Sequence, residues 1–250
     1  KWVKTEMALK SGIDLVLELP TVYSISSAEN FAEGAIKLLN SLKIVDTISF
    51  GSENSDIDIL NRISGILYEE PKQYVEFLNE ELKKGLSFPK ARENAILLYL
   101  NDKKYSNILN QPNNTLAIEY LKALKKYKSH IMPISIKREK AFYNSNCIVD
   151  EYASATAIRN MIVNNQFNDI RKVMPRLAYD LLMQEIENNQ YVIDISKFEK
   201  ETLYSIRRLS TADLKKFPEV NEGLENSIKN AANSCNTLAE LINIIKSKRY

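Results

Sequence analysis

The stretch Val45-Asp46-Thr47-Ile48-Ser49-Phe50-Gly51-Ser52-Glu53 decides the fold that the sequence predicts. Residues 45–50 form a short apolar run typical of a buried strand, and a glycine-containing turn follows it. Runs of the same kind at 13–19 and 131–136 predict two more strands. Amphipathic segments between these runs predict helices at 28–42, 57–68, 71–85, 91–100 and 115–127, with a break at 112–114. Strands that alternate with helices predict an α/β layer built on a parallel sheet.

The strand signal fades after residue 167. Helices are predicted at 177–188, 200–210, 224–232 and 237–246. We therefore expect two domains, an α/β domain over residues 1–171 and a helical domain over residues 172–250.

Composition narrows the class of protein. Of the 250 residues, 44% are hydrophobic and 26% are charged, with 6 Gly and 7 Pro, which excludes collagen, low-complexity chains and disulfide-rich miniproteins. Two cysteines and a single histidine, His130, exclude a cysteine cage or a multi-histidine site within the chain, so no metal site is predicted. The two cysteines also favour a reducing, cytoplasmic location. No apolar stretch is long enough to cross a bilayer, so no membrane partner is expected.

The start of the chain suggests a fragment. It has no initiator Met, no apolar signal region, and opens in a predicted helix at 5–10.

Three short strings predict a ligand site at the ends of the strands. Gly51 follows a strand, where a glycine lets a ligand approach the main chain, although such a glycine is more often a simple turn. Asn113 and Asn114 precede a helix, where they either cap free amides or face a nucleotide together with the helix start. Arg138 ends the strand at 131–136, either as a solvated residue or as a bidentate phosphate ligand.

A fourth string predicts an anion site at the start of a helix. Ser154 is a cap-type residue, Thr156 follows two positions later, and Arg159 lies one turn into the helix. Free amides, a hydroxyl and a guanidinium there would converge on phosphate oxygens, whereas the commoner explanation is a plain capped helix with an exposed arginine.

Charged residues leave two further questions open. A group of basic side chains forms either a phosphate-facing patch or a solvated helix face, and its members are Lys122, Lys125, Lys126, Lys128, Lys137, Arg138 and Lys140. A smaller basic group contains Arg207, Arg208, Lys246, Lys248 and Arg249. Within the apolar run 13–19, the acids Asp14 and Glu18 need partners, and the candidates are Lys1, Lys4 and Arg138.

Several strings in fixed order carry a family resemblance. They are 1–9, 14–20, 24–29, 50–53, 85–92, 112–114, 154–159 and 222–226, and they include Phe50-Gly51-Ser52-Glu53 and Gly85-Leu86-Ser87-Phe88-Pro89-Lys90-Ala91-Arg92. In this order the chain resembles the bacterial tRNA(Met) cytidine acetate ligases of the HIGH-type nucleotidyltransferase superfamily.

The resemblance implies a fold and an activity. The fold is a Rossmann-like nucleotidyltransferase sheet, here without its first strand–helix unit, followed by a helical C-terminal domain that binds tRNA. The activity uses ATP and Mg²⁺ to convert acetate to acetyl-adenylate, and then acetylates the wobble cytidine of elongator tRNA(Met). The implied ATP-binding residues are Gly51, Asn113, Asn114, Arg138, Ser154, Thr156 and Arg159, and the implied tRNA contacts are Lys122, Lys125, Lys126, Arg207, Arg208, Lys248 and Arg249.

One family motif has no counterpart here. The HxGH phosphate motif is absent from the chain, so no catalytic residue is assigned, and we expect this polypeptide alone to have little ligase activity. Two other functions stay open. One is a nucleotidyltransferase that acts on a phosphorylated small metabolite, and the other is a catalytically silent nucleotide- or RNA-binding module.

Overall fold

The computed structural model describes residues 1–138, 153–188 and 195–246. The chain divides into two compact units, residues 1–184 and residues 185–250. The boundary expected at Arg171 falls inside the first unit, within helix α9 (Phe167–Val173). Among the described residues, no helix has the length and apolar character needed to span a membrane.

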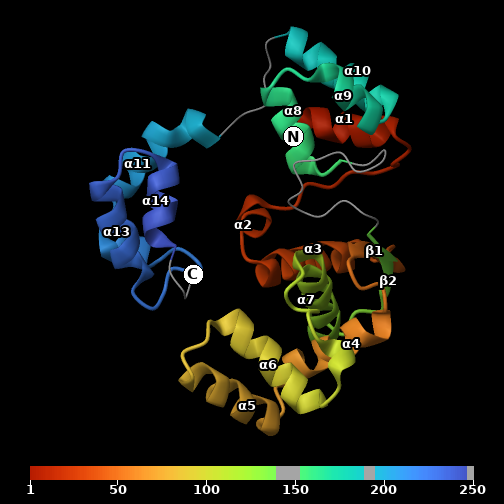
Figure 1. Cartoon of the computed structure of the whole chain (residues 1–250). Coiled ribbons are helices and arrows are strands. Elements are labelled where there is room, and N and C mark those ends of the chain that lie inside the picture. Colours follow the sequence, from red (N-terminus) through yellow and green to blue (C-terminus); the bar gives the residue numbers. More distant parts are fainter. Residues whose placement is uncertain (139–152, 189–194, 247–250) are drawn as a thin grey trace. The chain divides into compact units, whose positions relative to one another are not determined.

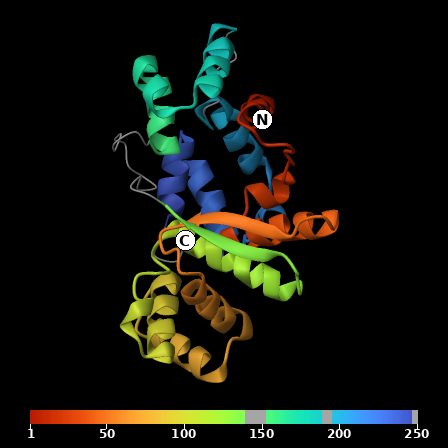
Figure 2. The same cartoon turned by 90° about the vertical axis from the view of Figure 1, so that its right-hand side faces the viewer.

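A parallel pair of strands forms the sheet of the first unit. Strands β1 (Thr47–Ser52) and β2 (Met132–Lys137) align Thr47 with Met132 at one end and Ser52 with Lys137 at the other. Figure 2 shows the two strands running side by side. The strands predicted at 45–50 and 131–136 are therefore confirmed, each displaced by one or two residues. Because both strands run the same way, their carboxyl ends meet at one edge of the sheet.

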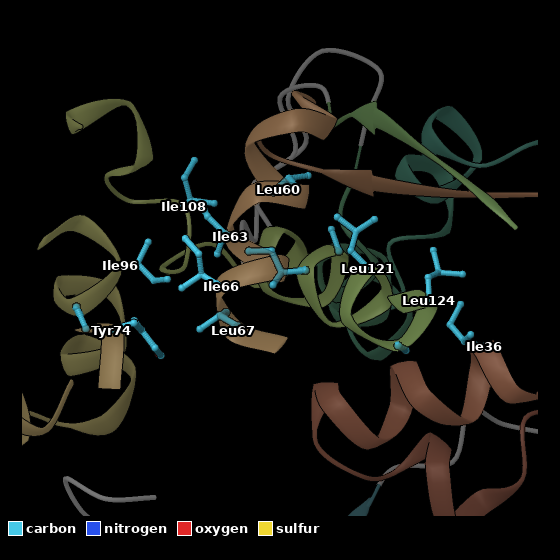
Figure 3. Packing of buried hydrophobic residues seen from close by; sticks show 14 of the residues in the cluster. Ile36, Leu60, Ile63, Ile66, Leu67, Tyr74, Ile96, Ile108, Leu121 and Leu124 are labelled. Carbon is cyan, nitrogen blue, oxygen red and sulfur yellow. The ribbon is translucent and has the colours of Figure 1, made fainter. Parts of the chain in front are cut away.

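Three helices pack around this sheet and supply most of the core. They are α3 (Ala28–Leu42), α4 (Ile57–Glu69) and α7 (Pro112–Lys126), and α7 contacts both other helices and β1 (Figure 1). Asp56 starts α4 by accepting hydrogen bonds from the amides of the first turn, and Leu60, Ile63 and Leu67 then recur at helical spacing. Figure 3 shows Ile63 and Ile66 between Ile96 and Leu121. Helix α4 therefore packs into the core through this periodic apolar face.

Two helices form a hairpin on the side of this core. Helix α5 (Lys72–Lys83) packs against α6 (Phe88–Leu100), and the short 3₁₀ turn η1 (Lys103–Tyr105) follows. The buried carboxylate of Glu93 accepts hydrogen bonds from the Asn107 amide at 3.0 Å and from Asn110 Nδ2 at 2.8 Å. Glu93 thereby fixes the connection from α6 to α7.

The first unit also contains helices at both ends of its sequence. These are α1 (Trp2–Lys10), α2 (Thr21–Ser24), α8 (Ala155–Val163), α9 and most of α10 (Arg176–Glu187), which extends past residue 184 into the second unit. Helix α2 packs on α3, and α8 packs on α9.

The regular elements in the described part of the second unit are all helices or 3₁₀ turns. It contains the 3₁₀ turn η2 (Ile195–Phe198) and helices α11 (Glu199–Arg208), α12 (Thr211–Leu214), α13 (Leu224–Ser234) and α14 (Leu238–Ile245). Leu203, Ala231 and Leu241 lie in its own small core. The helices predicted at 200–210, 224–232 and 237–246 are confirmed here.

The strand predicted at 13–19 is wrong. The described residues of this segment form no regular element, and Ile13, Leu15 and Leu17 are exposed. A strand needs a neighbour for its backbone hydrogen bonds, and in the described part of the chain the sheet consists of β1 and β2. Lys1 Nζ does lie 2.9 Å from Glu18 Oε1, so one of the partners proposed for the two acids is confirmed.

Candidate functional site

Arg138 lies over Gly51 at the carboxyl end of the two strands. The Arg138 amide donates to the Ser52 carbonyl at 2.9 Å, which continues the β1–β2 ladder by one bond. A Cβ atom placed on Gly51 would lie 3.2 Å from Arg138 Cγ and 3.8 Å from its Nη1. Gly51 therefore leaves room for the arginine stem, and its exposed backbone lies beside a guanidinium at the edge where ligands of open parallel sheets bind.

Glu53 joins the end of β1 to the start of α7. Its Oε1 accepts hydrogen bonds from Asn113 Nδ2 at 2.6 Å and from the Asn113 amide at 3.3 Å. Its Oε2 accepts from the Asn114 amide at 2.8 Å. A carboxylate is favoured at a helix N-terminus, where amides are free and the helix dipole is positive. These two amides of α7 therefore bind Glu53.

Asn114 ties the same elements together from the other side. Its side chain is almost fully buried; Oδ1 accepts from the Asn54 amide at 2.8 Å, and Nδ2 donates to the Ile108 carbonyl at 3.2 Å. The expected break at 112–114 is wrong, because α7 begins at Pro112, a residue well suited to the first helical position. The two alternatives predicted for these asparagines were capping of free amides and contact with a nucleotide. In the structure Glu53 satisfies the amides of α7, and Asn114 holds the turn after β1.

The second predicted group lies on α8. Ser154 Oγ accepts from the Ala157 amide at 3.0 Å, which confirms the predicted cap. Ser154 is buried, Thr156 is half-buried, and Arg159 is exposed on the next turn. The structure thus places Gly51 beside Arg138, and it places Asn113 and Asn114 against Glu53 and Asn54, which directly follow β1. Ser154, Thr156 and Arg159 lie at the start of α8.

In the first unit, two of the lysines predicted to contact tRNA form ion pairs with glutamates. Lys122 Nζ lies 2.7 Å from Glu119 Oε2 and 3.0 Å from Glu29 Oε1, and Lys126 pairs with Glu33. Burial raises the pKa of Glu33, but hydrogen bonds from Lys126 and Tyr127 outweigh it and hold that pKa below its ordinary value. Carboxylates therefore neutralise the charge of two of the three lysines of α7, Lys122 and Lys126.

In the second unit, Arg207 donates from Nε to the Ala232 carbonyl and from Nη2 to the Cys235 carbonyl, both at 2.7 Å. It thereby satisfies carbonyls at the end of α13. Arg208 lies over the Tyr204 ring at 5.7 Å from its centroid. Lys248 and Arg249 lie outside the described residues, and the tRNA contacts of the whole set stay a prediction.

Sequence reasoning missed the role of Glu53. Glu53 belongs to the string 50–53, but its partners are 60 and 61 positions away, and no local sequence pattern predicts such a pairing. Ser52 was missed in the same way: it is fully buried at the end of β1, where its Oγ contacts Ser135 Oγ on β2.

Comparison with known proteins places this geometry in a family. A family model described as HIGH Nucleotidyl Transferase matches residues 1–250. The chain belongs to the HIGH nucleotidyl transferase family.

Individual relatives agree with this assignment. A tRNA(Met) cytidine acetate ligase of Thermoanaerobacter sp. (strain X514) is 46% identical over 250 residues, which are all of this chain and 62% of the relative. One of Clostridium perfringens (strain ATCC 13124) is 44% identical over 258 residues, 63% of the relative. The chain thus spans less than two thirds of the length of these HIGH-family relatives.

Two solved structures match the whole chain. The apo crystal structure of Thermotoga maritima TmcAL superposes with a TM-score of 0.92 at 33% identity and is covered to 60%. The same protein bound with alpha-thio ATP superposes with a TM-score of 0.87 and is covered to 59%. The expected fold, a nucleotidyltransferase-like sheet with a helical C-terminal region, is therefore confirmed.

Proposed function

We propose that this chain supplies the ATP-binding part of a tRNA(Met) cytidine acetate ligase. The observation that carries the proposal is that Arg138 lies beside Gly51 at the carboxyl ends of two parallel strands, while Asn114 binds the Asn54 amide in the turn after β1. Relatives that bear this enzyme's name, and a structural neighbour bound with alpha-thio ATP, support it.

Each residue at the strand ends has a role that follows from its chemistry. The exposed Gly51 backbone admits the flat part of a nucleotide, and the Arg138 guanidinium offers paired donors to phosphate oxygens. Asn113 and Asn114, held by Glu53, form the wall of the site rather than a free anion cradle. Ser154, Thr156 and Arg159 add a capped helix start with a guanidinium for the remaining phosphates.

The proposed reaction has two balanced steps. An acetate oxygen attacks the α-phosphorus of ATP, an O–P bond forms, and pyrophosphate leaves with the electrons of the broken P–O bond. The exocyclic amine of the wobble cytidine then attacks the acetyl carbonyl, loses a proton, and releases AMP. Two anions must approach each other in the first step, and Arg138 and Arg159 are the cations that would lower this repulsion.

The described residues do not fit a protein-held Mg²⁺ site. They contain no group of three acidic, histidine or cysteine side chains suited to a metal. The carboxylate closest in sequence to the strand ends, Glu53, is engaged with the amides of α7. Mg²⁺ would therefore come with the ATP phosphates, which is its usual mode of binding, and no step is assigned to it here.

A transplant tests the proposed function in a protein of full length. In a chimera, these 250 residues replace the matched residues of the Thermoanaerobacter ligase. We expect incorporation of labelled acetate into elongator tRNA(Met), with pyrophosphate release that requires acetate and that continues over many turnovers only when tRNA is present. The same chimera with Arg138→Ala should lose most of this incorporation.

Two results would contradict the proposal. One is pyrophosphate release that depends on a phosphorylated metabolite in place of acetate. The other is a chimera that folds, binds tRNA(Met) and yet transfers no acetate.

A further inference from the structure

A cavity lies among the helices of the first unit. Its volume is about 520 Å³, and residues of α3, α4, α5, α6 and α7 line it. None of the residues assigned above to the ATP site is among the lining residues. A volume of this size is typical of a site for a small molecule or a single nucleotide.

Two of the strings that carry the family resemblance meet at this cavity. The string 24–29 contributes Glu29, and the string 85–92 contributes both Phe88 and Arg92. The proposed ATP site uses neither string. A cavity therefore joins two otherwise unexplained parts of the sequence.

The polar groups of the cavity converge on one buried carboxylate. The Glu119 side chain is 4% exposed; its Oε1 lies 3.5 Å from Arg92 Nη1, and its Oε2 lies 2.7 Å from Lys122 Nζ. A guanidinium has five donors, more than this one contact at 3.5 Å uses. The Glu119 carboxylate is an acceptor, and Arg92 and Lys122 beside it are donors. This arrangement is complementary to a nucleobase edge on which an exocyclic amine donates and a neighbouring ring nitrogen or carbonyl accepts.

Aromatic side chains complete the lining. Phe88, the first residue of α6, is 52% exposed, and Tyr68 is 46% exposed. Tyr74 and Leu67, which are labelled in Figure 3, are buried lining residues. A half-exposed phenyl ring beside a polar hollow is the arrangement on which unpaired bases stack.

The charge of the lining argues against a phosphate as the ligand. Four carboxylates and three cationic side chains line the cavity, so its balance is slightly negative. A phosphate would be repelled, whereas a neutral planar base with an amine donor is not.

We propose that this cavity binds one unpaired RNA base that bears an exocyclic amine, stacked on Phe88 and held at its edge by Glu119 and Arg92. The assignment to RNA rests on the proposed function, since a tRNA-modifying enzyme must hold an unpaired loop. The cavity is then a recognition site for a second nucleotide, apart from the nucleotide that reacts.

Short oligonucleotides test the site without ATP or acetate. We expect the 250-residue chain to bind oligo(rA) or oligo(rC) octamers about tenfold more tightly than oligo(rU), as measured by fluorescence anisotropy, because uracil lacks the amine. Phe88→Ala should weaken oligo(rC) binding about 5- to 150-fold, the usual effect of losing one stacked base. Leu98→Ala is the matched control, because Leu98 is 48% exposed on the same helix but does not line the cavity.

A second variant reports on the base edge. Glu119→Gln keeps the side-chain volume but replaces one acceptor oxygen with an amide donor, so it should lower the preference for amine-bearing bases. The melting temperature of each variant shows whether it is folded, and Phe88→Leu is used if Phe88→Ala does not fold.

The outcomes separate this inference from the proposed function. Equal binding of oligo(rC) by wild type and Phe88→Ala, or no binding by the wild type, overturns the cavity site even if the chimera acetylates tRNA. Binding that depends on Phe88 and Glu119 supports the site even if the chimera transfers no acetate.

Discussion

At the scale of single residues, the carboxylate of Glu53 accepts three hydrogen bonds from the first turn of α7. It places a negative charge at a helix N-terminus that would otherwise attract a phosphate. In the proposed ATP site, the cationic contacts to a triphosphate would then fall to Arg138 and to Arg159 on α8. Glu53 therefore shapes the site while lowering its positive charge.

Removing this carboxylate should destabilise the first unit. Glu53→Ala leaves amides of Asn113 and Asn114 without their acceptor, and we expect the free energy of unfolding to fall by about 1–3 kcal/mol. Urea denaturation measures the change. Glu76→Ala is the control, since Glu76 is exposed on α5 and its loss should change stability by less than about 0.5 kcal/mol. A similar effect of both substitutions would contradict the role given to Glu53.

Gly51 is expected to matter for the ligand more than for the fold. In Gly51→Ala the new methyl group would lie 3.2 Å from Arg138 Cγ, so the arginine must shift by a few tenths of an ångström. We predict weaker ATP binding with a small change in melting temperature. Gly65→Ala is the matched control, because nothing lies within 4 Å of its added Cβ and a helical alanine should stabilise α4 by about 0.5–1 kcal/mol. Unaltered ATP affinity in Gly51→Ala would argue against the site.

At the scale of elements, sequence patterns predicted most helices and two strands, because each carries its own periodic apolar face. The pattern misled at 13–19, where Asp14 and Glu18 interrupt an apolar run that has no pairing partner in the described chain. Pairing is a property of two segments, so one run cannot reveal it. The break predicted at 112–114 was wrong for another reason. Proline can either end a helix or begin one, and Pro112 begins α7.

The candidate site was predictable only in part. Gly51 lies within β1 rather than in the turn predicted after residue 50, whereas Arg138 follows β2 as predicted. Because both strands were correctly predicted, the proximity of these two residues could be inferred from topology. The link from Glu53 to α7 could not, because it spans 60 residues and depends on how the helix packs.

The contact of α5 with its neighbours should depend on pH through Tyr74. Burial raises the pKa of this phenol to about 12, above its ordinary value of 10. A raised folded-state pKa means that the stabilisation is complete below pH 10 and is lost as pH rises from about 10 to about 12. We expect the wild type to lose up to about 2–3 kcal/mol more than Tyr74→Phe across this range, measured by urea denaturation. Parallel curves for the two proteins would contradict the burial argument.

At the scale of the whole molecule, each compact unit has its own core. One core contains Ile63, Ile96 and Leu121, and the other contains Leu203, Ala231 and Leu241. Because the cores are separate, a substitution that destabilises one unit should leave the stability of the other unchanged.

Two alanine substitutions test this independence. Ile63→Ala and Leu241→Ala should each cost about 2–5 kcal/mol in their own unit. Hydrogen exchange followed by mass spectrometry should then show faster exchange in residues 1–184 for the first variant and in residues 185–250 for the second. Faster exchange throughout the chain in either variant would show that the two units unfold together.

The central claim is that the carboxyl ends of β1 and β2 bind ATP through Arg138, and calorimetric titration of the chain with ATP tests it most directly. We predict a single ATP site in the wild type and a loss of about 1–3 kcal/mol in binding free energy for Arg138→Ala, the scale of a lost charged hydrogen bond. Arg62→Ala, an exposed arginine on α4, should bind ATP like the wild type. Equal ATP affinity in Arg138→Ala and the wild type would contradict the account.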